Sequence, residues 1–264
     1  GTLGINTPKY KKNVSNTTLD AIELSLWLKK IKKQKIENVI LEASSHGLKQ
    51  NRLDGLDFKL GIFTNLSHDH LDYHKNFKDY ADKWKKNKSI ITDIKITEYK
   101  KIKSIALKRN LNIKTISNDK SSLNIISHKY LEGKQLIEIK YKGKVYKFQT
   151  GLIGRIQIKN ILMAMLAAEK SEIKFEKIIK VINKVQPVKG RLEQVGYIKN
   201  KAKVILDYAH TPDALKTCLQ CLKEQFKGRR ISIVFGCGGN RDKSKRSMMG
   251  KIANSYCDKI YLTD

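Results

Sequence analysis

Two polar stretches in the first third of the chain follow short apolar runs and carry side chains that can bind charged ligands. Glu42–Leu48 reads Glu-Ala-Ser-Ser-His-Gly-Leu and follows the apolar run Val39–Leu41. Residues 64–74 read Thr-Asn-Leu-Ser-His-Asp-His-Leu-Asp-Tyr-His and follow Leu60–Phe63. Open α/β sheets bind their ligands outside the carboxyl ends of the strands. Both stretches are therefore candidates for a binding site.

Two further stretches lie in the last quarter of the chain, each between a predicted strand and a predicted helix. Asp207–Asp213 reads Asp-Tyr-Ala-His-Thr-Pro-Asp, in which the Thr-Pro pair suits a helix cap and a first helical turn. Those structural roles do not account for Asp207 and His210 together at a strand end. Phe235–Asp242 is rich in glycine, so its backbone can approach a phosphate at a helix N-terminus. Taken alone, it fits a tight turn before a helix equally well.

Alternating strands and helices must position these stretches, and the apolar periodicity predicts where they run. Asn16-Thr17-Thr18 predicts a helix start, and Lys142-Gly143 predicts a turn between two strands. Strands are expected at 39–41, 60–63, 88–93, within 123–149, and at 203–206, 231–235 and 259–262. Helices are expected after residue 18, up to residue 110, and at 156–168, 175–185, 211–226 and 243–256. A break at 187–191 predicts two α/β domains, 1–186 and 187–264, the second built on a parallel sheet.

The formal charge of +29 invites a nucleic-acid-binding interpretation, which we keep as an alternative. Eight of the 54 basic residues are arginine, the residue on which bidentate base and phosphate contacts depend. The lysines are scattered over every predicted element, so solvated lysines are the favoured explanation. No apolar run approaches the roughly 20 residues of a membrane span, and the start of the chain has no signal-peptide pattern. We therefore expect a cytoplasmic protein with no membrane and no nucleic-acid partner.

The cysteine pattern does not predict a metal site. Cys218 and Cys221 form a CxxC pair within a segment of helical periodicity. Because no second CxxC completes a zinc site, we interpret the pair as small buried residues of a helix. A disulfide framework is not expected in a long chain with these features.

The motifs occur in an order that resembles the Mur ligases, over nearly the whole chain. Stretches resembling the central domain of the tripeptide-forming member are Asn16–Thr18, Glu42–Arg52, residues 64–74 and Leu152–Asn160. Stretches resembling the carboxy-terminal domain of the family are Pro187–Arg191, Asp207–Ala214 and Phe235–Asp242. The resemblance implies an α/β fold: a central domain with a mostly parallel sheet flanked by helices and a small antiparallel part, then a truncated Rossmann-like carboxy-terminal domain.

The resemblance also implies an activity, an ATP-dependent and Mg²⁺-dependent ligation in peptidoglycan precursor synthesis. The stem-peptide carboxylate attacks the γ-phosphate of ATP, and the amine of the incoming amino acid displaces phosphate from the acyl phosphate. The implied partners are UDP-MurNAc-L-Ala-D-Glu and a diamino acid, with meso-diaminopimelate favoured over L-lysine. We expect a monomer.

The implied site residues fall into four groups. Contacts to the UDP-muramoyl dipeptide are assigned to Thr17, Thr18, Ser44, Gln50 and Arg52. Contacts to ATP are assigned to Asn160, Arg191, Asp207 and His210, of which Asp207 and His210 are also catalytic candidates. The candidate magnesium ligands are Glu42 and His70, and Lys83 is the candidate for the carbamylated lysine of the family.

The sequence departs from the family pattern in three places. It contains no phosphate loop ending in Gly-Lys-Thr, and it stops before the segment that selects the diamino acid, so we expect the 264-residue chain alone to be inactive. Lys83 is one residue too close to Tyr80, so loss of about one helical turn would rotate it out of the site. A folylpolyglutamate-synthetase-like ligase remains an alternative. The sequence of the Ser44–Leu48 loop argues against it.

Overall fold

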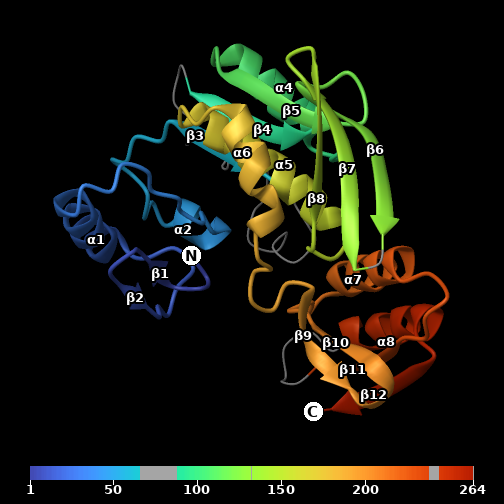
Figure 1. Cartoon of the computed structure of the whole chain (residues 1–264). Helices are drawn as coiled ribbons and strands as arrows, with labels where there is room; N and C mark the ends of the chain where they lie inside the picture. The colour runs from blue at the N-terminus through green and yellow to red at the C-terminus, as the bar shows by residue number, and fades with distance from the viewer. Residues whose placement is uncertain (66–87, 132, 238–243, 264) are drawn as a thin grey trace. The chain divides into compact units, whose positions relative to one another are not determined.

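The computed structural model describes residues 1–65, 88–131, 133–237 and 244–263. These residues form two compact units (Figure 1). The first unit comprises Gly1–Ile90 and Ile96–Ile113, and the second comprises Ile91–Lys95 and Lys114–Asp264.

The first unit contains two short strands, β1 (Ile5–Asn6) and β2 (Lys11–Lys12), which pair antiparallel. Its helices are α1 (Ala21–Lys33), α2 (Ser45–Lys49) and α4 (Tyr99–Lys108), and β3 spans Leu60–Phe63. One buried cluster joins Leu19 and Leu24 to Leu48 and Leu53, and so packs α1 against α2. The strand predicted at 60–63 is confirmed.

Two sequence predictions for the first unit are wrong. Helix α1 begins at Ala21 and is capped by Asp20, whose carboxylate accepts the N–H groups of Ile22 and Glu23. Asp competes well as an N-cap, and the hydroxyls of the predicted start at 16–18 are used elsewhere. The run Val39–Leu41 forms no strand within the described residues, and Ile40 is 94% exposed. An apolar run becomes a buried strand only where other strands pair with it.

A six-stranded sheet has the hydrogen-bonded order β3-β4-β5-β6-β7-β8. Its further strands are β4 (Ser89–Asp93), β5 (Asn112–Ser117), β6 (Leu123–Leu131), β7 (Lys134–Tyr141) and β8 (Lys144–Thr150). Strands β5 and β6 are parallel, whereas β6–β7 and β7–β8 are antiparallel. The turn predicted at Lys142-Gly143 is confirmed, with φ values of 49° and 80° that suit a hairpin turn. Strand β5 was not predicted.

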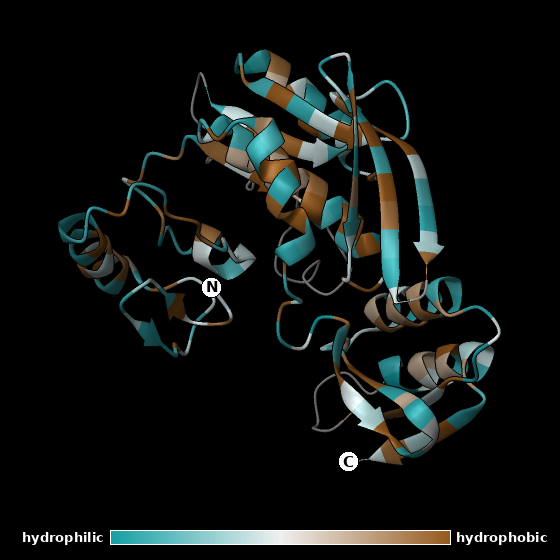
Figure 2. Ribbon diagram, viewed as in Figure 1, coloured by the Kyte–Doolittle hydropathy of each residue, from teal (hydrophilic) through white to brown (hydrophobic). Residues whose placement is uncertain are grey.

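Helix α5 (Arg155–Lys170) follows the sheet and carries the apolar face that its periodicity predicts. The buried residues of that face include Ile158, Ile161, Leu162, Met165 and Leu166. Helix α6 (Phe175–Val181) continues into a 3₁₀ turn at Ile182–Lys184, within the predicted range. In Figure 2 the hydrophobic residues of α5 are visible along the helix.

The remaining elements are β9 (Glu193–Ile198), β10 (Ala202–Leu206), α7 (Pro212–Gln225), β11 (Ser232–Gly236), α8 (Ser244–Tyr256) and β12 (Lys259–Thr263). Thr211 caps α7 through the N–H of Ala214, and Pro212 is in its first turn, as predicted. Strands β11 and β12 are parallel. In the described residues β10 pairs antiparallel with β9 and not with β11, so the expected three-stranded parallel arrangement is only partly confirmed.

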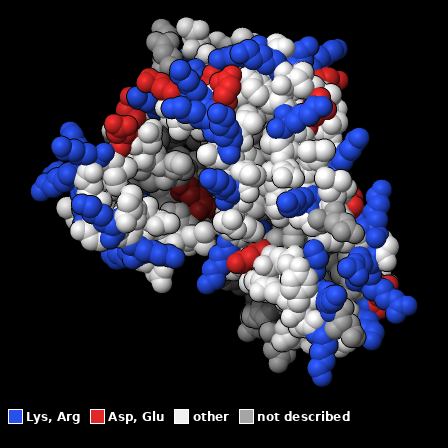
Figure 3. Space-filling model, in the orientation of Figure 1, with Lys and Arg blue, Asp and Glu red and all other residues white. Residues whose placement is uncertain are grey.

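The surface carries its lysines on many elements. On the face shown in Figure 3, Lys and Arg side chains are spread widely and Asp and Glu lie among them. None of the described helices is long and apolar enough to cross a membrane.

Candidate functional site

In the first unit, hydroxyl groups gather around Glu42. Glu42 Oε2 accepts the backbone N–H of Thr2 at 2.8 Å and its hydroxyl at 3.0 Å. The Thr17 hydroxyl lies 3.1 Å from that of Thr2, and because the Thr2 proton faces Glu42, Thr17 is the donor. The predicted metal ligand Glu42 and the predicted substrate residue Thr17 are therefore brought together through Thr2.

Thr18 connects this group to the start of helix α2. Its hydroxyl donates to the backbone carbonyl of Glu42 at 2.9 Å and accepts the backbone N–H of Ser44 at 2.8 Å. Ser44 Oγ lies 3.0 Å from the same hydroxyl and caps α2 by accepting the N–H of Gly47 at 3.1 Å. Since the side chain of Thr18 is only 4% exposed, these bonds fix the loop that carries Glu42 and Ser44.

Arg52 and Gln50 lie on the other side of Thr18. Arg52 Nη1 donates to the Thr18 carbonyl at 2.6 Å, and Arg52 Nε donates to Gln50 Oε1 at 2.8 Å. A guanidinium has five N–H donors, so three remain for a ligand. All five residues assigned to the dipeptide substrate thus lie in one bonded network or directly beside it.

Gly47 explains why this network is compact. A Cβ placed on Gly47 would lie 2.7 Å from Thr18 Cβ, a distance that real side chains do not reach. Only glycine lets the α2 backbone approach Thr18 this closely.

Two assigned residues fall outside the described part of the chain. They are His70, the second candidate magnesium ligand, and Lys83, the candidate carbamylated lysine. Among the residues that are described, no group of three or more His, Cys, Asp or Glu side chains could hold a metal ion.

In the second unit, the Asp207 carboxylate accepts hydrogen bonds from two backbone segments. Its Oδ2 accepts the N–H of Leu192 at 2.8 Å, and its Oδ1 accepts the N–H of Ala209 at 2.9 Å. The carboxylate therefore joins the end of β10 to the segment that contains Arg191. Each oxygen retains a lone pair for a ligand hydroxyl.

Exposed aromatic and cationic groups surround Asp207. The Arg191 guanidinium lies 5.4 Å from the ring centroid of Tyr208, within cation–π range. The His210 ring meets Tyr208 edge to face at 5.7 Å, and His210 Nδ1 lies 3.1 Å from the Tyr208 carbonyl. This surface offers a cation, a ring and a carboxylate, the groups with which proteins bind a nucleotide.

Asn160 joins the same group through Gln157. Asn160 Nδ2 donates to Gln157 Oε1 at 3.2 Å, and Gln157 Nε2 donates to the Arg191 carbonyl at 3.3 Å. The four residues assigned to ATP are thus linked in one chain of hydrogen bonds and neighbouring backbone. Gln157, Tyr208 and Thr2 were not among the candidates from the sequence, and only the structure shows that they contact candidate residues.

Buried groups fix the start of α5, which carries Gln157 and Asn160. Gln225 Oε1 accepts the Gly154 N–H at 2.7 Å, and Gln135 Nε2 donates to the carbonyls of Leu152 and Gly154 at 2.6 and 3.3 Å. Burial raises the pKa of the Cys221 thiol, and the backbone of Arg155 and Ile156 at the first turn of α5 acts against this.

Cys218 and Cys221 lie in helix α7, as the sequence predicts; Cys221 is buried, whereas Cys218 is half-buried. Burial, with the nearby Asp207 charge, raises the pKa of the Cys218 thiol to about 12. Of the glycine-rich loop, residues 238–243 lie outside the described residues, so its expected phosphate contact stays a prediction.

Comparison with known proteins covers most of the chain. Residues 1–168 match the Mur ligase middle domain, and residues 190–264 match the glutamate ligase domain of the Mur ligases. The chain is 37% identical over 277 aligned residues to the UDP-N-acetylmuramoyl-L-alanyl-D-glutamate–2,6-diaminopimelate ligase of Buchnera aphidicola subsp. Schizaphis graminum, covering 100% of this chain and 55% of that protein. It is 36% identical to the protein of the same name from Rickettsia bellii, covering 57% of it. The chain therefore spans about half the length of the curated relatives it matches.

Solved structures show the same relationship. A structure of a UDP-N-acetylmuramoyl-L-alanyl-D-glutamate–2,6-diaminopimelate ligase superposes with a TM-score of 0.75 at 28% identity, over 100% of this chain and 55% of the other. Folylpolyglutamate synthetase from Lactobacillus casei superposes with a TM-score of 0.67 at 14% identity, over 89% of this chain and 58% of the other, which shows a shared fold alone. With family matches over both parts of the chain and 37% identity to a member along the whole of this chain, the chain belongs to the Mur ligase family of ATP-dependent ligases.

Proposed function

We propose that the protein adds meso-diaminopimelate to UDP-MurNAc-L-Ala-D-Glu in peptidoglycan precursor synthesis. The observation that carries this proposal is the identity of 33–37% over the whole chain with relatives that bear this one enzyme name. The network around Thr18 is consistent with it, because it presents hydroxyl groups and a guanidinium on one surface.

The first unit holds the dipeptide substrate in this proposal. The three remaining N–H donors of Arg52 suit a carboxylate or a pyrophosphate of the UDP-muramoyl dipeptide. The bond from Arg52 Nε to Gln50 and the bond from Nη1 to Thr18 restrict the guanidinium to one orientation. A fixed guanidinium loses little conformational entropy when it binds, which favours recognition of one anionic group.

Glu42 suits magnesium by the chemistry of its surroundings. Mg²⁺ takes hard oxygen ligands and usually only one or two carboxylates of the protein. Glu42 Oε2 receives two hydrogen bonds from Thr2, which orient the carboxylate and leave Oε1 for a ligand. We place the ion at Glu42 and, as a prediction, at His70.

ATP is assigned to the second unit. Asp207 would accept hydroxyl groups of the nucleotide, and Arg191 beside Tyr208 would face its phosphates or its base. Bound ATP supplies the phosphoryl group that converts the substrate carboxylate into an acyl phosphate, which the amine then attacks. The residues of this chain contribute positioning and charge neutralisation, which dominate in phosphoryl transfer.

The test is phosphate release by the complete gene product. We expect ATP-dependent release with UDP-MurNAc-L-Ala-D-Glu plus meso-diaminopimelate, and much less with L-lysine or with a folate plus glutamate. Turnover with L-lysine in preference would overturn the choice of amino acid, and turnover with the folate alone would overturn the substrate class. Arg52→Ala should raise KM for the UDP-muramoyl dipeptide, while Arg229→Ala, an exposed arginine outside the Thr18 network, should not.

A cytoplasmic location and a monomeric state belong to the same proposal. UDP-linked precursors and ATP are found in the cytoplasm, and fractionation of cells would show the location. Size-exclusion chromatography with light scattering would show the oligomeric state.

A further inference from the structure

The first four residues form a turn against the carboxylate of Glu42. The Gly4 N–H donates to the Gly1 carbonyl at 2.8 Å and closes this turn. The φ of Gly4 is 87°, and a Cβ at that position would collide with the Lys12 carbonyl oxygen, so glycine is required there. A Cβ on Gly1 would lie 2.9 Å from Glu42 Oε2. The turn therefore brings its backbone directly beside the carboxylate.

Thr2, the second residue of this turn, binds one of the two carboxylate oxygens of Glu42. Its backbone N–H and its hydroxyl both donate to Glu42 Oε2, at 2.8 and 3.0 Å. Within the described residues, no hydrogen bond or ion pair involves Glu42 Oε1. Two donors on one oxygen restrict rotation of the carboxylate, as outer hydrogen bonds do for carboxylates that bind metals. Oε1 is therefore held in one orientation and remains available to a ligand.

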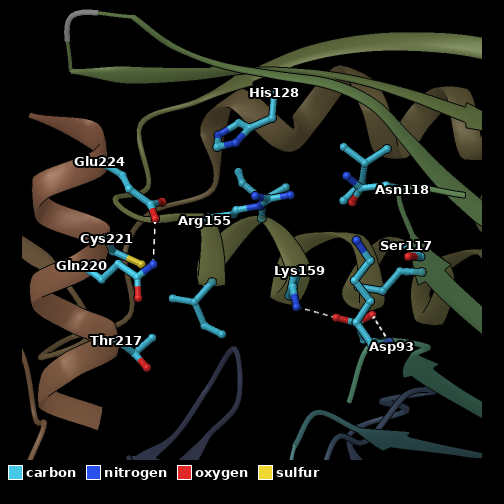
Figure 4. Close-up of a pocket in the computed structure, with 15 residues that line it drawn as sticks. Asp93, Ser117, Asn118, His128, Arg155, Lys159, Thr217, Gln220, Cys221 and Glu224 are labelled. Carbon is cyan, nitrogen blue, oxygen red and sulfur yellow. Dashed lines mark hydrogen bonds and ion pairs between the residues drawn. The ribbon is translucent and has the colours of Figure 1, made fainter. Parts of the chain in front are cut away.

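The carboxylates of a pocket in the second unit (Figure 4) use both of their oxygens within the protein. Asp93 accepts the Lys95 N–H with Oδ1 at 2.8 Å and pairs with Lys159 through Oδ2 at 2.5 Å. Glu224 accepts a tyrosine hydroxyl with Oε2 at 3.2 Å and a glutamine amide N–H with Oε1 at 3.1 Å. Glu42 differs from both, because the described residues engage only its Oε2. This difference favours a ligand-binding role for Oε1.

The direction of the hydrogen bonds determines what Thr17 offers to a ligand. A carboxylate only accepts, so the Thr2 hydroxyl gives its single proton to Glu42. The Thr17 hydroxyl lies 3.1 Å from that of Thr2 and must then donate to it. Thr17 forms no other side-chain hydrogen bond with a described residue. Its oxygen therefore meets a ligand as an acceptor, which pairs with an N–H or O–H group and not with a phosphate or carboxylate oxygen.

We infer that Thr2 is a positioning residue that orients Glu42 and Thr17 together. It leaves Glu42 Oε1 for the metal ion and makes Thr17 an acceptor for an amide N–H or a hydroxyl of the UDP-muramoyl dipeptide. The anionic groups of the dipeptide have no proton to give to Thr17 and are left to Arg52. This inference rests on the proposed function, and it specifies the chemistry of the substrate group that meets Thr17.

The first experiment is a titration of the complete gene product with Mn²⁺ alone, in which electron paramagnetic resonance measures the free ion. Thr2→Val removes the hydroxyl and keeps the backbone N–H, so we expect about fivefold weaker binding. Thr2→Ser should restore the affinity to within about twofold. The double variant Thr2→Val/Glu42→Gln should bind no more weakly than Glu42→Gln, because Thr2 acts through Glu42.

The matched control is Thr7→Val, in the same unit. The Thr7 hydroxyl bonds only to the backbone of Tyr10 and does not contact Glu42, so its loss should leave the Mn²⁺ affinity unchanged. Unaltered Mn²⁺ affinity in Thr2→Val, or in Glu42→Gln, would overturn the inference. An equal loss in Thr7→Val would also overturn it, since the effect would then reflect general destabilisation of the unit.

The second experiment is calorimetric titration with UDP-MurNAc-L-Ala-D-Glu, without metal or nucleotide. We expect Thr17→Val to weaken binding about tenfold and Thr2→Val to weaken it about threefold. The double variant should equal Thr17→Val, and additive losses would overturn the role of Thr2 at Thr17. If the unaltered protein does not bind this nucleotide, the proposed function fails, and the role of Thr17 fails with it. The Mn²⁺ titration still decides the role of Thr2 at Glu42, so the two failures are distinguishable.

Discussion

The hydroxyl of Thr18 lies 2.8 Å from the backbone nitrogen of Ser44 and accepts its N–H. The two residues are 26 positions apart, yet this bond sets the position of the Glu42 loop and the start of α2 together. Thr18 was assigned to the substrate, and its hydroxyl is fully used within the protein: it donates once and accepts twice. It therefore acts by positioning Glu42 and Ser44.

Thr18→Val should destabilise the first unit by about 1–3 kcal/mol, because the buried Ser44 N–H loses its acceptor. Thr18→Ser keeps the hydroxyl and should cost clearly less. Amide hydrogen exchange of Ser44 and Gly47 is the measurement, since it reports local opening of this network. Equal protection in the valine and serine variants would show that the hydroxyl does not hold the loop.

Gly47→Ala should destabilise the same network by about 1–3 kcal/mol, because the new methyl overlaps Thr18 Cβ. Gly250 is the matched control: it also lies in a helix, and a Cβ there meets nothing within 4 Å. Gly250→Ala should stabilise α8 by up to about 1 kcal/mol. Urea unfolding of both variants gives the comparison, and destabilisation by both would contradict the packing argument.

Asp207→Ala should leave two backbone N–H groups, those of Leu192 and Ala209, without an acceptor. Asp207→Asn should leave only one of them without an acceptor, because an amide retains one acceptor oxygen. We expect costs of about 2–3 and about 1 kcal/mol, respectively. Faster amide exchange at Leu192 and Ala209 would show the effect directly. Asp213→Asn, on the exposed first turn of α7, should leave both amides protected.

Acidification should lower the stability of the second unit through protonation of Glu169. Burial raises the pKa of the Glu169 carboxyl, but hydrogen bonds from Lys114 and Lys142 outweigh burial and bring the pKa to about 2. A depressed folded-state pKa gives stability that is present above the unfolded value near 4.5 and is lost as pH falls toward 2. Because one partner is solvent-exposed, we expect a loss of only about 1 kcal/mol. Glu169→Gln should flatten this part of the stability profile, and Glu172→Gln should not.

The His128 ring should titrate below the usual range of histidine. Burial lowers its pKa, the bond to Gln135 works against this, and the Arg155 charge lowers the pKa further. The folded state then binds fewer protons than the unfolded state, so stability rises with pH up to about 6.5 and falls on acidification below it. Titration of the ring protons by NMR gives the value, which Arg155→Gln should shift upward. A midpoint above 6.5 in the unaltered chain would contradict the burial argument.

The sequence by itself determined the family, the α/β class and most of the helices. Motifs such as Asp207–Ala214 carry that information because the residue types and their spacing are local properties. Helix α7 was predicted with its cap because the Thr-Pro pair acts within a single turn. The apolar face of α5 was predicted because a helical period of about 3.6 residues is visible in the sequence itself.

Only the tertiary structure decided which polar groups form hydrogen bonds within the protein. The bonds of Thr18 to Glu42 and Ser44 and the bond of Asp207 to Leu192 each join segments that are distant in sequence. The burial of the Ser117 hydroxyl, without a partner in the described part of the chain, also depends on distant segments. The exposure of Val39 and Ile40 depends in the same way on which strands lie beside them. Spacing along a chain specifies neighbours within a turn, whereas pairing across the fold depends on how the elements pack.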